Sequence, residues 1–240
     1  LAFIEACTGS SKSFAYLITT ITSGARAFIS TANKTLQTQL WEKDLPTLHQ
    51  VLHRPFTAAL LKGRNNYVCL HKLQDTRRQL NLPGLESDLA DLIQRLDETP
   101  SGDVEDLRLH RDLRQAVTAG QHDCLGRDCP DFAYCYYEQA KQRAEQADVV
   151  VINHALLAYN LVMPFLAPRP VVVVDEAHEL ERYTLHALRL EMAYATIPQL
   201  VNDAVVLRHA ADGVRQEAIR LNHSLFTRLT EASAEWDRPG

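Results

Sequence analysis

The stretch "VVVVDEAHE", Val171 to Glu179, decides the fold class of this 240-residue chain. Four consecutive valines are typical of a strand that is covered on both faces of a parallel sheet. Asp175 and Glu176 follow at its carboxyl end, where a metal-dependent phosphoryl-transfer site requires acids. Asp175 is expected to hold Mg²⁺ through water, and Glu176 to orient or deprotonate the attacking water. The alternative is a solvent-facing helix start, because Asp and Glu also favour the first helical turn.

A second motif, "ACTGSSKS" from Ala6 to Ser13, has the layout of a phosphate-binding loop. In such loops backbone N–H groups and a helix N-terminus surround phosphate oxygens, while Lys adds charge and Ser or Thr holds Mg²⁺. Lys12 and Ser13 are correctly placed, but Ala6 and Ser11 occupy the two positions where the pattern requires glycine. Alone, the loop is better explained as an ordinary strand–turn–helix junction. Together with the acidic strand end, it predicts an ATP site.

The remaining pattern predicts an α/β fold with an insertion. Strand and helix patterns alternate in the first 60 residues or so, and they return near residue 147. Between residues 62 and 140 the pattern is mainly helical, and from Leu185 the chain is helical again. We therefore expect a parallel α/β domain, one insertion and a helical C-terminal segment. The expected strands are 1–6, 25–31, one beginning at 147 and 171–174, and the expected helices include 12–23, 33–52 (interrupted by Pro46), 85–98 and 103–117, with a turn at 99–103.

Composition narrows the functional class. A net charge of −5 argues against a uniformly basic surface but permits a local basic groove. No apolar run is long enough to span a bilayer, and no secretory signal precedes the first predicted strand. Because the chain lacks an initiator Met and begins inside that strand, we expect a fragment. Five cysteines without a signal peptide favour metal binding or chemistry over disulfides.

Four of the cysteines form a candidate metal site. Cys69, Cys124, Cys129 and Cys135 are separated by 54, 4 and 5 residues. Three thiols within a dozen positions and a distant fourth can form a tetrahedral sulfur site, and Zn²⁺ and an iron–sulfur cluster fit equally well. Cys7 lies in the phosphate loop and is interpreted as a small residue that fills a turn.

Six segments, in this order, carry a family resemblance. The chain resembles the XPD-like superfamily 2 iron–sulfur DNA helicases, and within them the DinG/YoaA branch, over about residues 1–181. The segments are "EACTGSSKS", "ISTANKTLQTQL", "LKGRNNYVC", "CLGRDCPDFAYC", "ADVVVINHALL" and "VVVVDEAHELE".

The resemblance implies a RecA-like motor domain that hydrolyses ATP and moves 5′ to 3′ on single-stranded DNA. Its implied domains are RecA-like residues 1–61 and 144–181, an iron–sulfur domain at 62–143, and the start of a helical arch at 182–240. Implied partners are single-stranded and forked duplex DNA, with no membrane, in a bacterial, nucleoid-associated cytoplasmic protein of DNA repair or replication. The second RecA-like domain, which the motor needs for activity, is expected to be missing.

The resemblance also assigns roles to residues. Lys12, Asp175 and Glu176 would be catalytic, and Ser13 and Asp175 would bind Mg²⁺. His178 would couple nucleotide state to DNA, and the four cysteines would hold a [4Fe–4S] cluster. The implied ATP-binding set is Thr8, Gly9, Ser10, Ser11, Lys12, Ser13, Asp175 and His178.

Implied DNA contacts are less specific. Ser30, Thr31 and Thr35 are expected to meet the DNA backbone, and Lys62 and Arg64 to meet phosphates. Stacking on bases is one interpretation of Tyr67, Phe132 and Tyr134, and packing in a small metal domain is the other. Asn153-His154 matches a family motif with either a structural or a DNA-contacting role.

The phosphate loop departs from the family pattern Glu-Ala-Gly-Thr-Gly-Thr-Gly-Lys. Cys7 and Ser11 replace two of its glycines, and Ser11 lies where glycine-only backbone angles are expected. Weakened ATP binding and hydrolysis are therefore expected. The alternative function is a metal-stapled module that binds single-stranded DNA with impaired or absent ATPase activity.

Overall fold

The computed structural model describes residues 2–5, 11–32, 34–79, 86–120, 123–188, 197, 201 and 210–236. The chain divides into two compact units, residues 1–188 and 189–240. The first unit contains the sheet and the site residues. In the second unit, α12 (Asp212–Trp236) is a single long helix.

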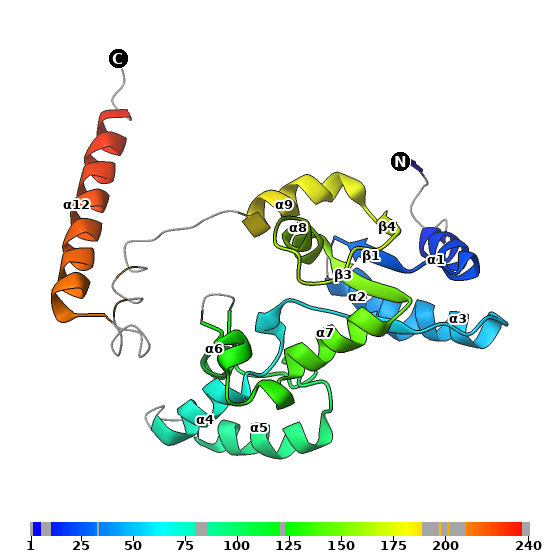
Figure 1. Ribbon diagram of the computed structural model, residues 1–240, viewed down its shortest axis with the longest axis horizontal. Coiled ribbons are helices and arrows are strands. Elements are labelled where there is room, and N and C mark those ends of the chain that lie inside the picture. Colours follow the sequence, from blue (N-terminus) through cyan, green and yellow to red (C-terminus); the bar gives the residue numbers. More distant parts are fainter. Residues whose placement is uncertain are drawn as a thin grey trace. The chain divides into compact units, whose positions relative to one another are not determined.

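A four-stranded parallel sheet forms the centre of the first unit (Figure 1). Its order is β2-β3-β1-β4, and every described pair is parallel. Ile29 of β1 lies opposite Val151 of β3 and Val173 of β4, so these strands end at one edge. The predicted parallel α/β fold is therefore confirmed. The strands are β1 (Ala27–Thr31), β2 (Ala58–Leu60), β3 (Val149–Asn153) and β4 (Val171–Val174).

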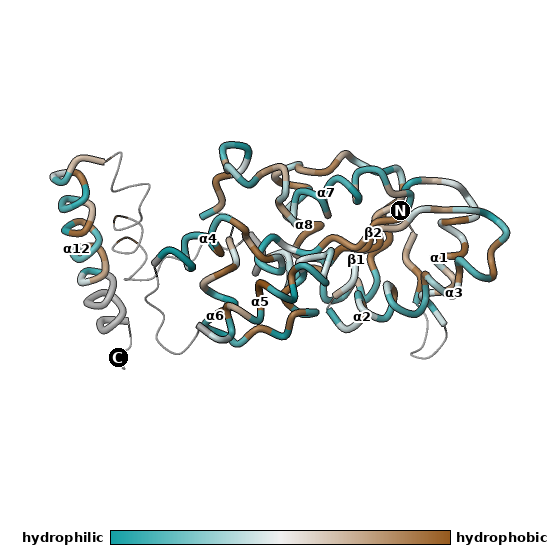
Figure 2. The backbone as a smooth tube through the Cα atoms, turned by 90° about the horizontal axis from the view of Figure 1, so that it is seen from below, coloured by the Kyte–Doolittle hydropathy of each residue, from teal (hydrophilic) through white to brown (hydrophobic). Residues whose placement is uncertain are grey.

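Helices cover both faces of this sheet. Because successive strand side chains point to opposite faces, Phe28 and Ile29 of β1 enter different cores. One core includes α1 and the segment from α2 to α3, and the other includes α7 and α8. In Figure 2 the residues of the strands are mainly hydrophobic, and the helices beside them contain more hydrophilic residues. The helices are α1 (Lys12–Ser23), α2 (Lys34–Gln39), α3 (Leu45–Val51), α7 (Tyr136–Gln146) and α8 (His154–Val162).

The inserted segment packs around a core of its own. Its helices α4 (Leu70–Gln79), α5 (Glu86–Glu98) and α6 (Arg111–Val117) lie together, apart from the sheet (Figure 1). Leu73, Leu92 and Leu113, one from each helix, are all buried in this core. After the acidic strand end, α9 (Leu180–Leu188) packs against α8.

Two strand predictions need correction. Residues 2–5 form no strand, and Phe3 and Ile4 are almost fully exposed. An apolar pattern does not supply the neighbouring strand that a ladder requires, and none of the described strands pairs with this segment. The second correction concerns β4, which lies next to one described strand: its Val172 is 47% exposed, so the strand is not covered on both faces.

Two helix predictions also change. The helix expected at residues 103–117 begins only at Arg111, because Asp103 pairs as a β-bridge with Tyr67 and its carboxylate accepts a hydrogen bond from the Glu105 N–H. Pro46 does not interrupt the helical course of residues 34–51. A π-helical segment, Leu40–Asp44, separates α2 from α3 and places Pro46 in the first turn of α3, where its missing N–H is tolerated.

Among the described helices, none is both long enough and apolar enough to cross a membrane.

Candidate nucleotide and metal sites

Helix α1 begins immediately after the altered phosphate loop. Ser11 precedes it with φ 53° and ψ 36°, in the left-handed region that favours glycine. This supports the expectation that the position requires glycine-like angles. The predicted ATP-binding residues Thr8, Gly9 and Ser10, together with Cys7, lie outside the described residues.

Ser11→Gly is expected to stabilise the protein by about 1 kcal/mol, because a non-glycine residue in the left-handed region costs about that much. For a chain of this size the melting temperature should rise by about 2–4 °C in thermal denaturation. Ser11→Ala keeps the Cβ atom and is the matched control. An equal gain in Ser11→Ala would show that the backbone angle is not the source of the strain.

Lys12 and Glu176 meet across 164 positions of sequence. The Lys12 Nζ lies 2.9 Å from the Glu176 Oε1, and about 30% of each side chain is exposed. Glu176 follows β4 with φ 55°, a left-handed conformation that is uncommon for a residue with a Cβ atom. The hydrogen bond from Lys12 lowers the pKa of Glu176. Two of the three residues predicted to be catalytic are therefore in direct contact.

Asp175 lies beside this pair. Its N–H donates to the Ser30 carbonyl at 2.9 Å, which extends the contact between β4 and β1 by one residue. The Tyr16 hydroxyl of α1 donates to the Asp175 Oδ2 at 3.2 Å. Burial and the adjacent Asp175 raise the pKa of Tyr16, so its hydroxyl stays protonated as a donor at neutral pH. Sequence reasoning missed Tyr16, although its position one helical turn after Lys12 places both on the same face of α1.

His178 is near the pair but points largely to solvent. Its side chain is 72% exposed, and Nδ1 lies 3.6 Å from the Glu176 Oε2. The imidazole of His178 is therefore a surface neighbour of the Glu176 carboxylate.

A buried histidine lies behind the acidic turn. His154 is fully buried, its Nδ1 lies 2.7 Å from the Ser30 Oγ, and its ring contacts Tyr183 edge-on. Burial lowers the pKa of His154. This effect outweighs that of the backbone groups of Glu176 and Asp175, which favour the charged form of the imidazole. The Asn153 side chain caps α8 by accepting from the Leu156 N–H at 2.7 Å. In this structure Asn153 and His154 have structural roles.

The four predicted metal ligands line one pocket. Cys69, Cys124, Cys129 and Cys135 are free thiols of intermediate exposure that face it together. The Arg64 Nη1 lies 2.7 Å from the Cys124 Sγ, and the Gly126 N–H donates to the same sulfur at 3.3 Å. Such donors stabilise a thiolate and its metal bond. The thiols thus suit a four-sulfur site, for Zn²⁺ or for an iron–sulfur cluster.

Other possible ligand atoms lie in the same pocket. Atoms of His71, Cys129 and Asp131 lie within 4.8 Å of one another. Burial raises the pKa of Cys69 and of Cys129, so a metal has to displace protons from these thiols.

Several predicted DNA contacts are buried. Ser30 and Thr31 have no exposed surface, and Lys62 is 7% exposed, so none of these side chains is available to DNA in this structure. Tyr67 is 5% exposed and its hydroxyl accepts from the Lys62 N–H, which places it in the core. By contrast, Tyr134 is 71% exposed and Thr35 is exposed, whereas Arg64 and Phe132 are partly buried. Helices cover both faces of β1, which a local polar pattern does not reveal, and this explains why Ser30 and Thr31 are buried.

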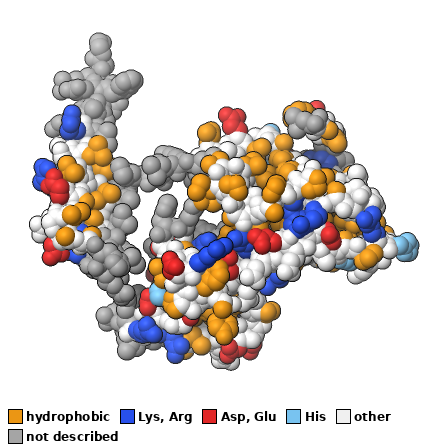
Figure 3. All heavy atoms as spheres, in the orientation of Figure 1, with side chains coloured by type: hydrophobic (Ala, Val, Ile, Leu, Met, Phe, Trp, Pro, Cys, Tyr) orange, Lys and Arg blue, Asp and Glu red, His pale blue; other side chains and the backbone are white. Residues whose placement is uncertain are grey.

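Charges are mixed on the face drawn in Figure 3, where Lys and Arg side chains lie among Asp and Glu side chains. This face is therefore not uniformly basic, as the net charge of −5 predicts.

Comparison with known proteins supplies the family. No protein-family model matches the chain. The chain is 37% identical to ATP-dependent DNA helicase YoaA of Haemophilus influenzae over 189 residues. Its identity to ATP-dependent DNA helicase YoaA of Escherichia coli is also 37%, over 188 residues. It is 38% identical to ATP-dependent helicase DinG of Mycobacterium tuberculosis over 252 aligned positions, which cover 90% of this chain.

The matched part is 74% of this chain for the two YoaA proteins, and it spans 29%, 30% and 38% of the three relatives. The order of motifs, the parallel sheet and the contact between Lys12 and Glu176 agree with this similarity. The chain therefore belongs to the DinG/YoaA family and corresponds to about a third of the length of these relatives.

Proposed function

We propose that this chain forms the first RecA-like motor domain of an ATP-dependent DNA helicase, with an inserted iron–sulfur domain and the start of an arch. The contact of 2.9 Å between Lys12 and Glu176 is the observation that carries the proposal. It brings the lysine of the altered loop to the acids that follow β4, and a nucleotide site needs both groups on one phosphate chain. The names of the YoaA and DinG relatives support ATP and DNA as ligands.

The proposed chemistry assigns a role to each group. Lys12 would leave Glu176 and bind the β- and γ-phosphates, and Thr8 to Ser11 are the loop residues proposed to bind the same phosphates. Ser13 and Asp175 would hold Mg²⁺, whose charge would offset that of the phosphates. Glu176, released from Lys12, then orients the attacking water and accepts its proton. His178, beside Glu176, is proposed to report the nucleotide state to the DNA side.

The domain bounds, the cluster type and the direction of movement are proposed from the resemblance to the helicase family. We propose a RecA-like part at residues 1–61 and 144–181, an iron–sulfur domain at 62–143 with a [4Fe–4S] cluster on the four cysteines, and an arch from 182. The proposed activity is 5′ to 3′ movement on single-stranded DNA and unwinding of forked duplexes, in repair or replication, in the bacterial cytoplasm at the nucleoid. A second RecA-like domain completes the site, because hydrolysis needs transition-state contacts beyond binding.

Ser11 favours a second candidate function. Ser11, the loop residue directly before Lys12, has a Cβ atom although its backbone is in the left-handed region. This Cβ atom weakens phosphate binding where the loop does not adjust to it. A metal-stapled module that binds single-stranded DNA without ATP turnover would follow.

The two functions are separated by measuring MgATP binding, oligothymidylate binding and phosphate release. Hydrolysis is measured in a chimera in which residues 2–188 replace the matching segment of Escherichia coli YoaA. The helicase proposal predicts MgATP binding by the 240-residue chain and DNA-stimulated phosphate release by the chimera. DNA binding without either ATP signal would establish the second function, and binding of neither ligand would exclude both.

A further inference from the structure

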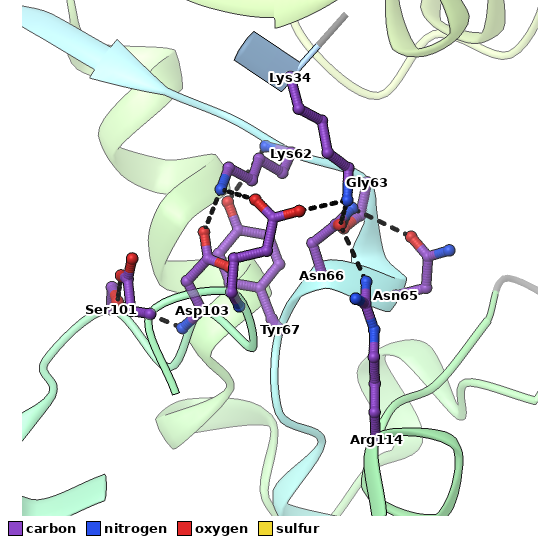
Figure 4. Close-up of polar contacts among 11 residues, drawn as sticks. Lys34, Lys62, Gly63, Asn65, Asn66, Tyr67, Ser101, Asp103 and Arg114 are labelled. Carbon is purple, nitrogen blue, oxygen red and sulfur yellow. Dashed lines mark hydrogen bonds and ion pairs between the residues drawn. The ribbon is translucent and has the colours of Figure 1, made fainter. Parts of the chain in front are cut away.

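Three basic side chains from separate parts of the first unit converge on one polar cluster (Figure 4). Lys34 begins α2, Lys62 follows β2, and Arg114 lies on α6. Lys34 and Arg114 both donate to the Asn66 Oδ1, at 3.0 and 3.4 Å. The cluster also contains two carboxylates, Asp103 and Glu105.

The two lysines of the cluster differ in burial and in the number of carboxylates that they contact. Lys62 is 7% exposed and contacts two carboxylates, the Asp103 Oδ2 at 2.6 Å and the Glu105 Oε2 at 2.7 Å. Lys34 has 48% of its side chain exposed and forms an ion pair with the Glu105 Oε1. Lys62 therefore has a carboxylate, Asp103, that Lys34 does not share.

Glu105 bridges the two lysines with different oxygens. Burial alone would raise its pKa, but hydrogen bonds from Lys34 and Lys62 outweigh burial and lower the pKa to about 2. Glu105 is thus a carboxylate at neutral pH. When Glu105 loses its contact with Lys34, the buried Lys62 still contacts both Asp103 and Glu105. Lys34 can therefore take another anion as its partner without leaving a buried charge unpaired.

The cluster lies at the functional edge of the sheet. Lys34 follows the carboxyl end of β1, and Lys62 follows that of β2. In open parallel sheets ligands bind at this edge, and Asp175 lies there at the end of β4. Thr35, next to Lys34, is also exposed.

We propose that Lys34 binds a phosphodiester of single-stranded DNA and that Glu105 occupies this position as an internal anion until DNA replaces it. A carboxylate oxygen and a phosphate oxygen accept the same charge-assisted hydrogen bond from an ammonium group. The inference rests on the proposed DNA-binding function and adds to it a named phosphate contact and the residue that masks it.

Glu105→Gln tests the mask. The amide retains the shape of the side chain but removes its charge, so Lys34 is released to DNA. Affinity of the 240-residue chain for fluorescent oligothymidylate at low salt is expected to rise about fivefold, the upper range for a partly exposed ion pair. The dependence of log K on log salt concentration should steepen by about 0.7, the value for one additional contact to a single strand.

Lys34→Gln is the matching test of the proposed phosphate contact. Alone it should weaken binding by about threefold, and in the double variant with Glu105→Gln the gain should vanish, because the two substitutions act on one contact. Asp91→Asn is the charge control. Asp91 is 3.7 Å from Arg95 on α5, and its substitution removes the same charge from the inserted segment, so affinity should change by less than about twofold.

The possible outcomes distinguish this inference from the proposed function. If the parent chain fails to bind DNA, the proposed function fails first. If the parent binds with normal salt dependence and Glu105→Gln gives no gain, or gives the same gain without Lys34, the mask is wrong. Thermal denaturation checks folding of each variant. Should Glu105→Gln unfold the chain, an unchanged affinity of Lys34→Gln would by itself overturn the inference.

Discussion

Glu176→Gln is expected to tighten MgATP binding by up to about fivefold while it lowers ATP hydrolysis by about 10²–10⁴-fold. The first effect follows from the ion pair at 2.9 Å, because the carboxylate competes with the triphosphate for Lys12. The second follows from loss of the proposed general base. Affinity is measured by titration of the 240-residue chain, and hydrolysis by phosphate release from the chimera with YoaA.

The control for this prediction is Glu179→Gln. Glu179 is three residues away and pairs with Arg182, so its substitution removes the same charge without touching Lys12. It should leave affinity and hydrolysis within about twofold of the parent. Weaker nucleotide binding by Glu176→Gln, or full hydrolysis, would contradict the assigned competition and the assigned base.

Cys129→Ser is expected to remove most of the bound metal and to destabilise the protein. A structural sulfur site contributes folding free energy, because the unfolded chain does not present its ligands together. A loss of at least about 3 kcal/mol would lower the melting temperature by about 6–12 °C for a chain of this size. Anaerobic purification, metal analysis and thermal denaturation provide the measurements, and a brown protein indicates iron–sulfur whereas a colourless one indicates zinc.

Cys7→Ser is the matched control for this prediction. Cys7 lies in the phosphate loop, outside the four-cysteine set, so the substitution should leave metal content and melting temperature unchanged. Retention of the metal by Cys129→Ser would contradict the assigned ligands. Equal metal loss in both variants would show that the effect does not come from the pocket.

Local patterns predicted much of the fold. The helix expected at residues 12–23 is α1 (Lys12–Ser23), because its apolar spacing and the glycine that follows it define both ends. The strands around Phe28, Val150 and Val173 form the expected parallel sheet. The contact between the loop lysine and the acids was also predictable, since both motifs belong to one type of site.

Other features depend on partners that a local pattern does not contain. Residues 2–5 have the composition of a strand but no described strand pairs with them. Residues 103–110 have a helical pattern, yet Asp103 bridges Tyr67 and contacts the buried Lys62. For the same reason a local pattern did not reveal that Lys62, an expected DNA contact, is buried whereas the Lys34 side chain is about half exposed.

The central claim is that Lys12 and Glu176 belong to a nucleotide site, and MgATP affinity of the chain with Lys12→Ala tests it most directly. Loss of one charge-assisted hydrogen bond to phosphate should weaken binding by about 10- to 100-fold relative to the parent. Circular dichroism checks that the variant keeps the secondary-structure content of the parent. Parent affinity for MgATP in a folded Lys12→Ala variant would contradict the account.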